Sequence, residues 1–156
     1  MANPWHHAVS SSRKWGGVPE DYLVVHEWFD ASKAHLADFR HRALRHHSQG
    51  IFWCVEVFGP TITLSTCRSC GKVENDPIHD EEGARLIRKT HDDDSESWPN
   101  VHAFEPKVIP TRWVGEQHVQ EDLGHIPTMA DWFRNIKAEP WMNRSRPLSR
   151  ELEAAG

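Results

Sequence analysis

Hydrophobic positions recur with a helical period in the first half of the chain. Over residues 20–30, intervals of three and four residues predict a helix with one buried face. This face carries Tyr22, Val25, His26, Phe29 and Asp30. A second helix is expected from about residue 31 to 49, with Gly50 as its break. A third, apolar helix is expected over residues 51–58, ending at Gly59-Pro60.

The flanking segments carry weaker signals. Residues 1–18 are expected to form an ordered arm that ends in a turn at Gly16-Gly17. The β-branched residues at 61–64 predict a short strand, with residues 108–109 or 112–114 as its partner.

Two short helices are expected near the C-terminus. The first covers residues 116–123, with Gly124 after its end. Thr128 and Asp131 form a capping box that opens the second, which runs to about residue 137 and buries Trp132, Phe133 and Ile136.

Together these elements predict a mainly α fold, α+β at most: a compact domain of four or five helices with a small β-hairpin and a loop-rich insert. The domain is expected to cover residues 1–142, and residues 143–156 are expected to be a flexible tail. Residues 65–107 form an acidic, cysteine-containing insert with six Lys/Arg against ten Asp/Glu.

Composition narrows the classes of protein. A chain of 156 residues with 38% hydrophobic and 26% charged residues is typical of one globular domain. The net charge of −5 does not favour nucleic-acid binding, although Arg40, Arg42 and Arg45 form a local basic stretch that could contact phosphates. Because no membrane-spanning stretch or secretory signal is evident, we expect a cytoplasmic protein.

Histidine is the conspicuous residue type, with seven of the twelve histidines in the first 47 residues. His26 and Asp30 are four residues apart, as are His118 and Asp122, a spacing that places each pair on one helical face. Imidazoles and carboxylates from separate elements are typical transition-metal ligands. The ligand set is predicted to be His7, His26, His47 and His118, with His6 and His46 as neighbouring alternatives and zinc as the favoured metal. A polar network that only fixes helix packing, or a solvated basic face, would also explain the histidines.

A metal site suggests a hydrolase that acts on a phosphoester or nucleotide. In this hypothesis Glu56, Glu116 or Asp122 activates a metal-bound water, and Arg40 and Arg42 hold a small anionic substrate. The alternative is a non-enzymatic module that binds a host protein or nucleic acid through a structural histidine network.

A second candidate site lies in the insert. Cys67 and Cys70 form a CxxC motif followed by Gly-Lys, which is typical of a zinc knuckle. One CxxC supplies two ligands, and His79, His91 or His102 could complete a tetrahedral site. Free thiols in a loop, or a redox pair, are the alternatives.

Several motifs resemble an uncharacterised family of small phage and bacterial proteins, catalogued only as a domain of unknown function. The motifs are Asp38-Phe39-Arg40-His41-Arg42-Ala43 with His46-His47, Gly50-Ile51-Phe52, Gly115-Glu116-Gln117-His118-Val119 and Glu121-Asp122-Leu123-Gly124. The similarity covers about residues 3–64 and 108–142. It implies a largely helical domain and no particular activity, and it leaves the Cys67/Cys70 insert outside the common pattern.

Overall fold

Helices make up most of the computed structural model, which describes residues 3–36, 38–80 and 102–135. The predicted fold class, mainly α with a small β-hairpin, is confirmed. The longer elements are α1 (Pro4–Trp15), α2 (Glu20–Asp30), α4 (Ser48–Phe58), β1 (Thr61–Cys67), β2 (Pro106–Pro110), α6 (Thr111–Leu123) and α7 (Met129–Asn135). The shorter helical segments are η1 (Ala31–Ala34), η2 (Phe39–His41), α3 (Arg42–Arg45) and η3 (Pro77–His79).

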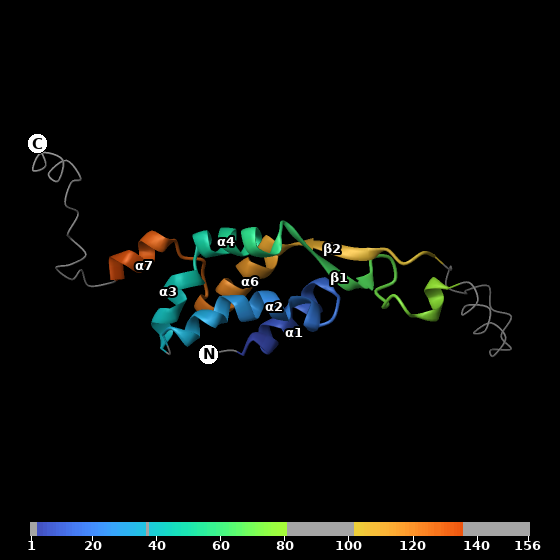
Figure 1. The fold of residues 1–156 in the computed structure, drawn as a ribbon, viewed down its shortest axis with the longest axis horizontal. Helices are drawn as coiled ribbons and strands as arrows, with labels where there is room; N and C mark the ends of the chain where they lie inside the picture. Colours follow the sequence, from blue (N-terminus) through green and yellow to red (C-terminus); the bar gives the residue numbers. More distant parts are fainter. Residues whose placement is uncertain (1–2, 37, 81–101, 136–156) are drawn as a thin grey trace, which may run out of the picture.

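The N-terminal arm is a helix. Asn3 accepts a hydrogen bond from the backbone of Trp5, Pro4 occupies the first turn, and the helix ends at Gly16 with φ of 85°. The helix that follows, α2, buries the five side chains predicted from its periodicity. α1 packs against α2, and Figure 1 shows the two helices side by side.

The expected continuous helix over residues 31–49 is wrong. The chain forms η1, η2 and α3 instead, and a new helix, α4, begins at Ser48. Asp38 caps η2, and the His47 side chain accepts a hydrogen bond from the backbone of Gly50 at the start of α4. Gly50 therefore lies inside a helix rather than at a break. Glycine is required at this position because a Cβ atom would lie 1.9 Å from the carbonyl oxygen of Arg45.

The two strands pair antiparallel, with Ile62 opposite Ile109 and Thr63 opposite Val108. Of the two predicted partners, residues 108–109 are the correct one, and residues 112–114 belong to α6. That helix begins at Thr111, before its expected start at residue 116, and ends as predicted, with Gly124 in the left-handed conformation at φ of 74°. In Figure 1 the hairpin projects from one end of the helical body.

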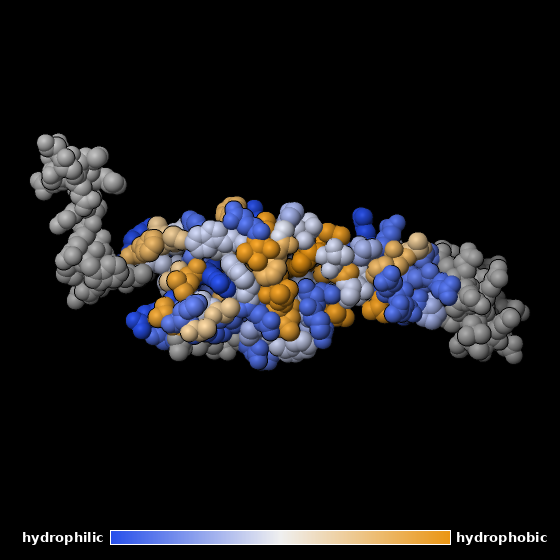
Figure 2. Space-filling model, in the orientation of Figure 1, coloured by the Kyte–Doolittle hydropathy of each residue, from blue (hydrophilic) through white to orange (hydrophobic). Residues whose placement is uncertain are grey.

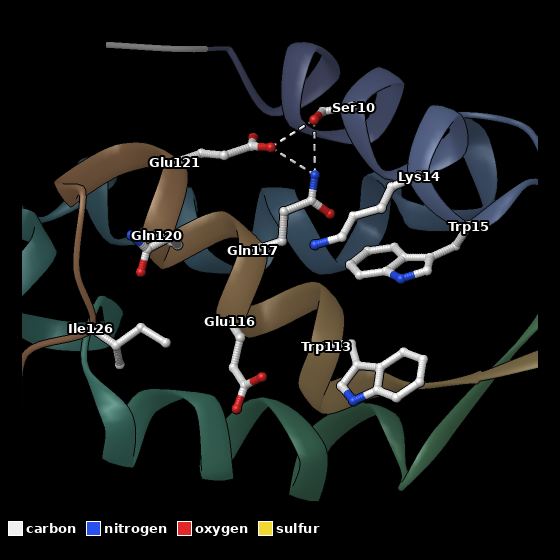
Figure 3. A pocket seen from close by; sticks show the side chains of 9 residues that line it. All are labelled: Ser10, Lys14, Trp15, Trp113, Glu116, Gln117, Gln120, Glu121 and Ile126. Atoms are coloured by element: carbon white, nitrogen blue, oxygen red, sulfur yellow. Dashed lines mark hydrogen bonds between the residues drawn. The ribbon is translucent and has the colours of Figure 1, made fainter.

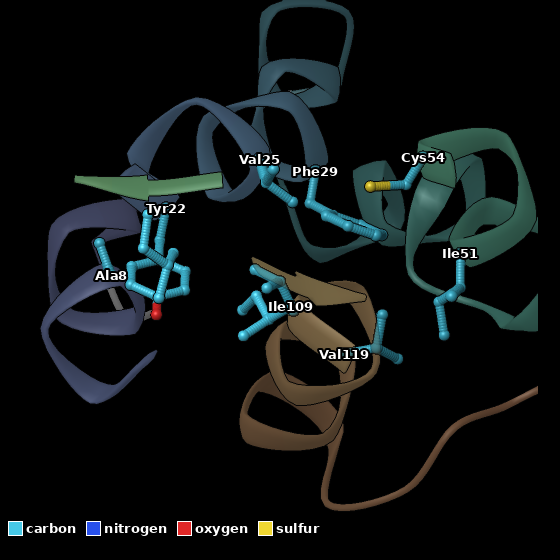
Figure 4. Packing of buried hydrophobic residues seen from close by; sticks show 10 residues of the cluster. Ala8, Tyr22, Val25, Phe29, Ile51, Cys54, Ile109 and Val119 are labelled. Carbon is cyan, nitrogen blue, oxygen red and sulfur yellow. The ribbon is translucent and has the colours of Figure 1, made fainter. Parts of the chain in front are cut away.

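The core lies where α6 meets α2 and α4 (Figure 4). Val114 and Val119 of α6, Phe29 of α2 and Ile51 of α4 are all buried and belong to one hydrophobic cluster. Gly115 allows the close approach, because a Cβ there would lie 3.2 Å from Cζ of Phe29. Helices from both halves of the sequence are thereby packed around one central helix.

α7 opens with the predicted capping box. Thr128 Oγ1 donates to Asp131 Oδ2 at 2.7 Å, and the backbone of Asp131 donates to Thr128 Oγ1 at 3.3 Å. Phe133 is 63% exposed, so its predicted burial is wrong, and Ile136 and the expected tail at 143–156 lie outside the described residues. None of the described helices has the length and apolarity needed to cross a membrane.

Candidate metal centres

Seven ionisable side chains are buried together where α1, α2, the α3–α4 junction and α6 meet. Each imidazole is at most 2% exposed, and the two carboxylates are 5–6% exposed. We call these residues the buried histidine centre: His7, His26, Asp30, His41, His46, His118 and Asp122. Burying so many polar groups costs several kcal/mol by order of magnitude unless each finds a partner. Hydrophobic packing alone does not explain why these polar groups are buried together.

Helical periodicity brings four of these seven residues together. His26 and Asp30 are one turn apart on the buried face of α2, and His118 and Asp122 are one turn apart on α6. His46 enters from the turn between α3 and α4. The ring of Phe29 stacks on His118, with 4.8 Å between centroids, so the apolar core forms one wall.

Three imidazole nitrogens surround one oxygen of Asp30. Oδ1 lies 3.8 Å from Nε2 of His41, 3.8 Å from Nε2 of His46 and 4.0 Å from Nε2 of His118. The Nε2 atoms of His46 and His118 are 3.1 Å apart. Within the part of the chain that the structure describes, Asp30 Oδ1 and His41 Nε2 have no hydrogen-bond partner. These atoms face one point at distances slightly too long for direct hydrogen bonds to Asp30.

Asp122 is the second carboxylate. Its Oδ2 lies 3.3 Å from His46 Nε2 and 3.0 Å from the Arg42 guanidinium, and its Oδ1 lies 3.3 Å from His7 Nε2. Burial alone would raise the pKa of Asp122, but hydrogen bonds from His46 and His7 and the charge of Arg42 hold this pKa well below its usual range. Asp122 is therefore an ionised carboxylate inside the protein.

A chain of hydrogen bonds determines which ring nitrogen carries the proton in His26 and in His118. Gln117 donates through Nε2 to Glu121 Oε1 at 2.7 Å and to Ser10 Oγ at 2.9 Å, so its Oε1 must accept. Ser11 Oγ donates to this Oε1 at 2.8 Å. Because the Ser11 hydroxyl proton is used in that bond, Ser11 Oγ accepts at 2.9 Å from Nε2–H of His26.

The same chain continues to His118. Since His26 carries its proton on Nε2, its Nδ1 accepts from Nδ1–H of His118 at 3.0 Å. Nε2 of His118 is then unprotonated, and its electron pair accepts from Nε2–H of His46 at 3.1 Å, with Asp30 Oδ1 4.0 Å away. His41 reaches the same state, because its Nδ1–H donates at 2.7 Å to the carbonyl of Asp38. Outer hydrogen bonds of this kind orient metal-binding histidines.

Burial keeps three imidazoles of the centre neutral. It lowers the pKa of His26 to about 3 and lowers the pKa values of His46 and His118 below their ordinary values. His7 differs, because the carboxylates of Asp122 and Glu121 outweigh its burial and raise its pKa. Neutral imidazole is the form that binds a metal ion.

The distances suit a transition metal. One ligand atom from each of four residues lies within 4.8 Å of the others: Asp30, His46, His118 and Asp122. Metal–nitrogen and metal–oxygen bonds of about 2.0–2.2 Å place neighbouring ligand atoms of a tetrahedron about 3.3–3.6 Å apart. The His46–His118 and His46–Asp122 separations of 3.1 and 3.3 Å are close to this range.

The structure brings four of the predicted site residues into this centre. They are His7, His26, His118 and Asp122. His47, the predicted ligand, is turned to the backbone of Gly50, and His46 takes the inward position. The sequence analysis gave His46 only as an alternative ligand, and it placed Asp30 beside His26 without including it in the ligand set.

The remaining predicted residues lie apart. Glu56 is exposed on α4, and Glu116 pairs with Arg112 at 2.6 Å. Arg40 is exposed and pairs with Asp38. Arg42 alone of the predicted substrate-binding residues contacts the centre, through Asp122.

An open pocket of about 620 Å³ borders the outer end of the hydrogen-bond chain (Figure 3). Ser10, Gln117 and Glu121 line one side of it. Trp15 and Trp113 line the other side, with their rings stacked at 6.4 Å. Solvent in this pocket therefore reaches the carboxylate that begins the chain.

A second group of possible ligands lies at the far end of the hairpin. Cys67 Sγ is 3.3 Å from His102 Nε2, and Cys70 Sγ is 3.2 Å from His79 Nε2. All four ligand atoms lie within 4.8 Å of one another. We call these four residues the hairpin-tip group. The third histidine considered from the sequence, His91, lies outside the described residues.

Comparison with known proteins gives a family and no activity. A family model described as Domain of unknown function (DUF6915) matches residues 2–92 and 77–142, two segments that overlap within the predicted insert. No curated protein and no solved structure matches the chain significantly.

Proposed function

Because the chain belongs to the family described as Domain of unknown function (DUF6915), we propose its function from its own residues: a metal-dependent hydrolase that acts on a small anionic substrate such as a phosphoester or nucleotide. The ion is held by Asp30, His46, His118 and Asp122, with His41 as a further donor. The observation that carries this proposal is the convergence of two imidazoles and two carboxylates on one buried point.

The donor set favours a reactive ion over a structural one. Structural zinc sites are closed tetrahedra, usually rich in cysteine, whereas catalytic ions keep a position for water. Here carboxylates and imidazoles provide the ligands, and His41 and His7 each approach one of the carboxylates. A bound divalent ion supplies a water whose pKa falls toward about 7. Of the three predicted catalytic acids, Asp122 belongs to the proposed ligand group, whereas Glu56 and Glu116 lie apart from it.

Two cations make an anionic substrate the best fit. Lys33 pairs with Asp30 at 2.7 Å, and Arg42 pairs with Asp122 at 3.0 Å. Their side chains are 31% and 15% exposed, so both reach solvent beside the buried carboxylates. With the two carboxylates engaged by an ion, Lys33 and Arg42 would hold a phosphate group through charge-assisted hydrogen bonds. Arg42 thus keeps its predicted role in substrate binding, joined by Lys33.

The first test is metal content together with activity. Protein purified without a histidine tag is analysed for metals, stripped, reloaded separately with manganese, iron and zinc, and assayed on phosphomonoesters, phosphodiesters and nucleotides. We expect one metal equivalent that depends on His118, and hydrolysis that is lost in His118→Ala while His6→Ala, a change in an exposed neighbour of His7, keeps both. A stripped chain that takes up none of these ions at the centre contradicts the proposal and leaves the binding-module alternative.

The hydrogen-bond chain gives a second test, with Gln117→Leu as the variant. Without the Gln117 acceptor, Ser11 is free to donate to His26, which moves the His26 proton to Nδ1 and the His118 proton to Nε2, where it blocks the metal. We expect the metal dissociation constant to rise about 10- to 100-fold, the usual effect of an outer-shell change. Isothermal titration of the stripped protein measures it.

The matched control is Gln120→Leu, which removes an exposed glutamine on the same helix that donates only to the carbonyl of Gly124. Equal dissociation constants for the Gln117 variant, the control and the unaltered chain would show that the hydrogen-bond chain does not prepare His118 for the ion.

A further inference from the structure

We infer that the hairpin-tip group, Cys67, Cys70, His79 and His102, is a closed Cys₂His₂ site for one structural zinc ion. This inference does not rest on the proposed hydrolase activity. Zinc bonds of about 2.3 Å to sulfur and 2.0–2.1 Å to nitrogen place tetrahedral sulfur and nitrogen ligands about 3.5 Å apart. The two sulfur–nitrogen distances, 3.3 and 3.2 Å, are close to that value.

The backbone shapes the cysteine turn for an ion. Gly71, with φ of 73°, donates to the carbonyl of Cys67 at 2.9 Å, and Cys67 donates to the carbonyl of Lys72 at 2.6 Å. Thr66 and Val73 form a β-bridge that closes the turn. Zinc would bind both sulfurs of this turn as thiolates.

His79 is prepared in the same way as the histidines of the buried centre. Its Nδ1–H donates to the carbonyl of Glu74 at 3.2 Å, which leaves the electron pair on Nε2, the atom that faces Cys70. Its ring meets the rings of His102 and Phe104 edge-on, both at 5.2 Å between centroids. The two imidazoles are thus held at a steep angle beside the two sulfurs.

Apolar burial does not explain the order of this region. Among residues 65–80 and 102–107, Thr66 and Cys67 are the only buried side chains. Figure 2 shows mostly hydrophilic side chains at this end of the face in view. Four bonds to one ion would join the end of β1, the end of η3 and the residues before β2. These bonds would replace the missing core as a source of order.

Cobalt titration of the stripped, reduced full chain distinguishes this site from the buried centre, because only thiolates give cobalt an intense ligand-to-metal charge-transfer absorption in the near ultraviolet. We expect one cobalt equivalent with this absorption in the unaltered chain, displaced by one equivalent of zinc. Cys67→Ser, Cys70→Ser, His79→Ala and His102→Ala should each weaken zinc binding at least about 100-fold. Ser69→Ala, an exposed change inside the same turn, should leave it unchanged.

Each further outcome decides the inference. Retained charge-transfer absorption in His46→Ala, together with its loss in Cys67→Ser, supports two independent sites. No thiolate absorption in the unaltered chain, or undiminished zinc affinity in both His79→Ala and His102→Ala, overturns the Cys₂His₂ assignment. Limited proteolysis adds a readout separate from the absorption, because zinc removal should speed cleavage between residues 65 and 107 and leave the helical body intact.

Discussion

His46→Ala is expected to lose the ion of the buried centre, whereas His47→Ala, the neighbouring change, keeps it. His46 Nε2 lies within 4 Å of His118, Asp30 and Asp122. Its removal would therefore take away the proposed metal ligand that lies near both carboxylates. We expect the dissociation constant to rise by more than the roughly 100-fold typical of an outer-shell change, and hydrolysis to fall with it. Elemental analysis after dialysis measures the loss.

The pair of variants is well matched, because both imidazoles are fully buried and both changes remove the same atoms. His47 serves the fold, since its Nδ1 accepts from the backbone of Gly50 at 3.0 Å, and losing this cap should cost about 1 kcal/mol of unfolding free energy. An equal loss of metal in both variants would show that the effect comes from unfolding. Full metal content in His46→Ala would exclude His46 as a ligand.

Gly50→Ala is expected to lower the free energy of unfolding strongly, although it adds only one methyl group. Helix propensity alone would favour alanine by up to about 1 kcal/mol. The added Cβ, however, would lie 1.9 Å from the Arg45 carbonyl oxygen and 2.7 Å from its carbon. Because backbone atoms cannot rotate away, α3 and α4 must separate, at a cost of about 3 kcal/mol, near the upper end of overpacking effects. Urea unfolding measures this change.

Gly115→Ala serves as the graded comparison. Its Cβ would meet the edge of the Phe29 ring at 3.2 Å, a side chain that needs to shift by only a few tenths of an ångström. We expect a loss of less than about 1 kcal/mol. Since His46 lies between Arg45 and Gly50, Gly50→Ala should also weaken metal binding. Unaltered stability in Gly50→Ala would mean that the two helices are not held at this separation.

The sequence was sufficient where the helical period was undisturbed. The spacing along α2 predicted all five buried side chains, and the i,i+4 pairs predicted that His26, His118 and Asp122 share a site. The β-branched residues at 61–64 predicted a strand that pairs with residues 108–109, but the register came only from the structure. Each of these features depends on neighbours in the sequence, which periodicity can detect.

The sequence was insufficient where tertiary contacts set the local structure. The break before α4 depends on a close approach between Arg45 and Gly50, which no residue pattern reveals. Once this break is misplaced by a few residues, His47 is predicted to face inward in place of His46. His41 was missed because it stands between two arginines and resembles part of a solvated basic face, although it is fully buried.

The order of the donors along the chain has a consequence for biosynthesis. The four residues of the hairpin-tip group are complete once His102 has been made, twenty residues before Asp122 (122 − 102 = 20). The buried centre needs α6, whose last turn carries Asp122, and so it is complete only after the hairpin. A nascent chain on the ribosome would therefore meet its thiolate-binding ion first and fold its helical interior around the second ion afterwards.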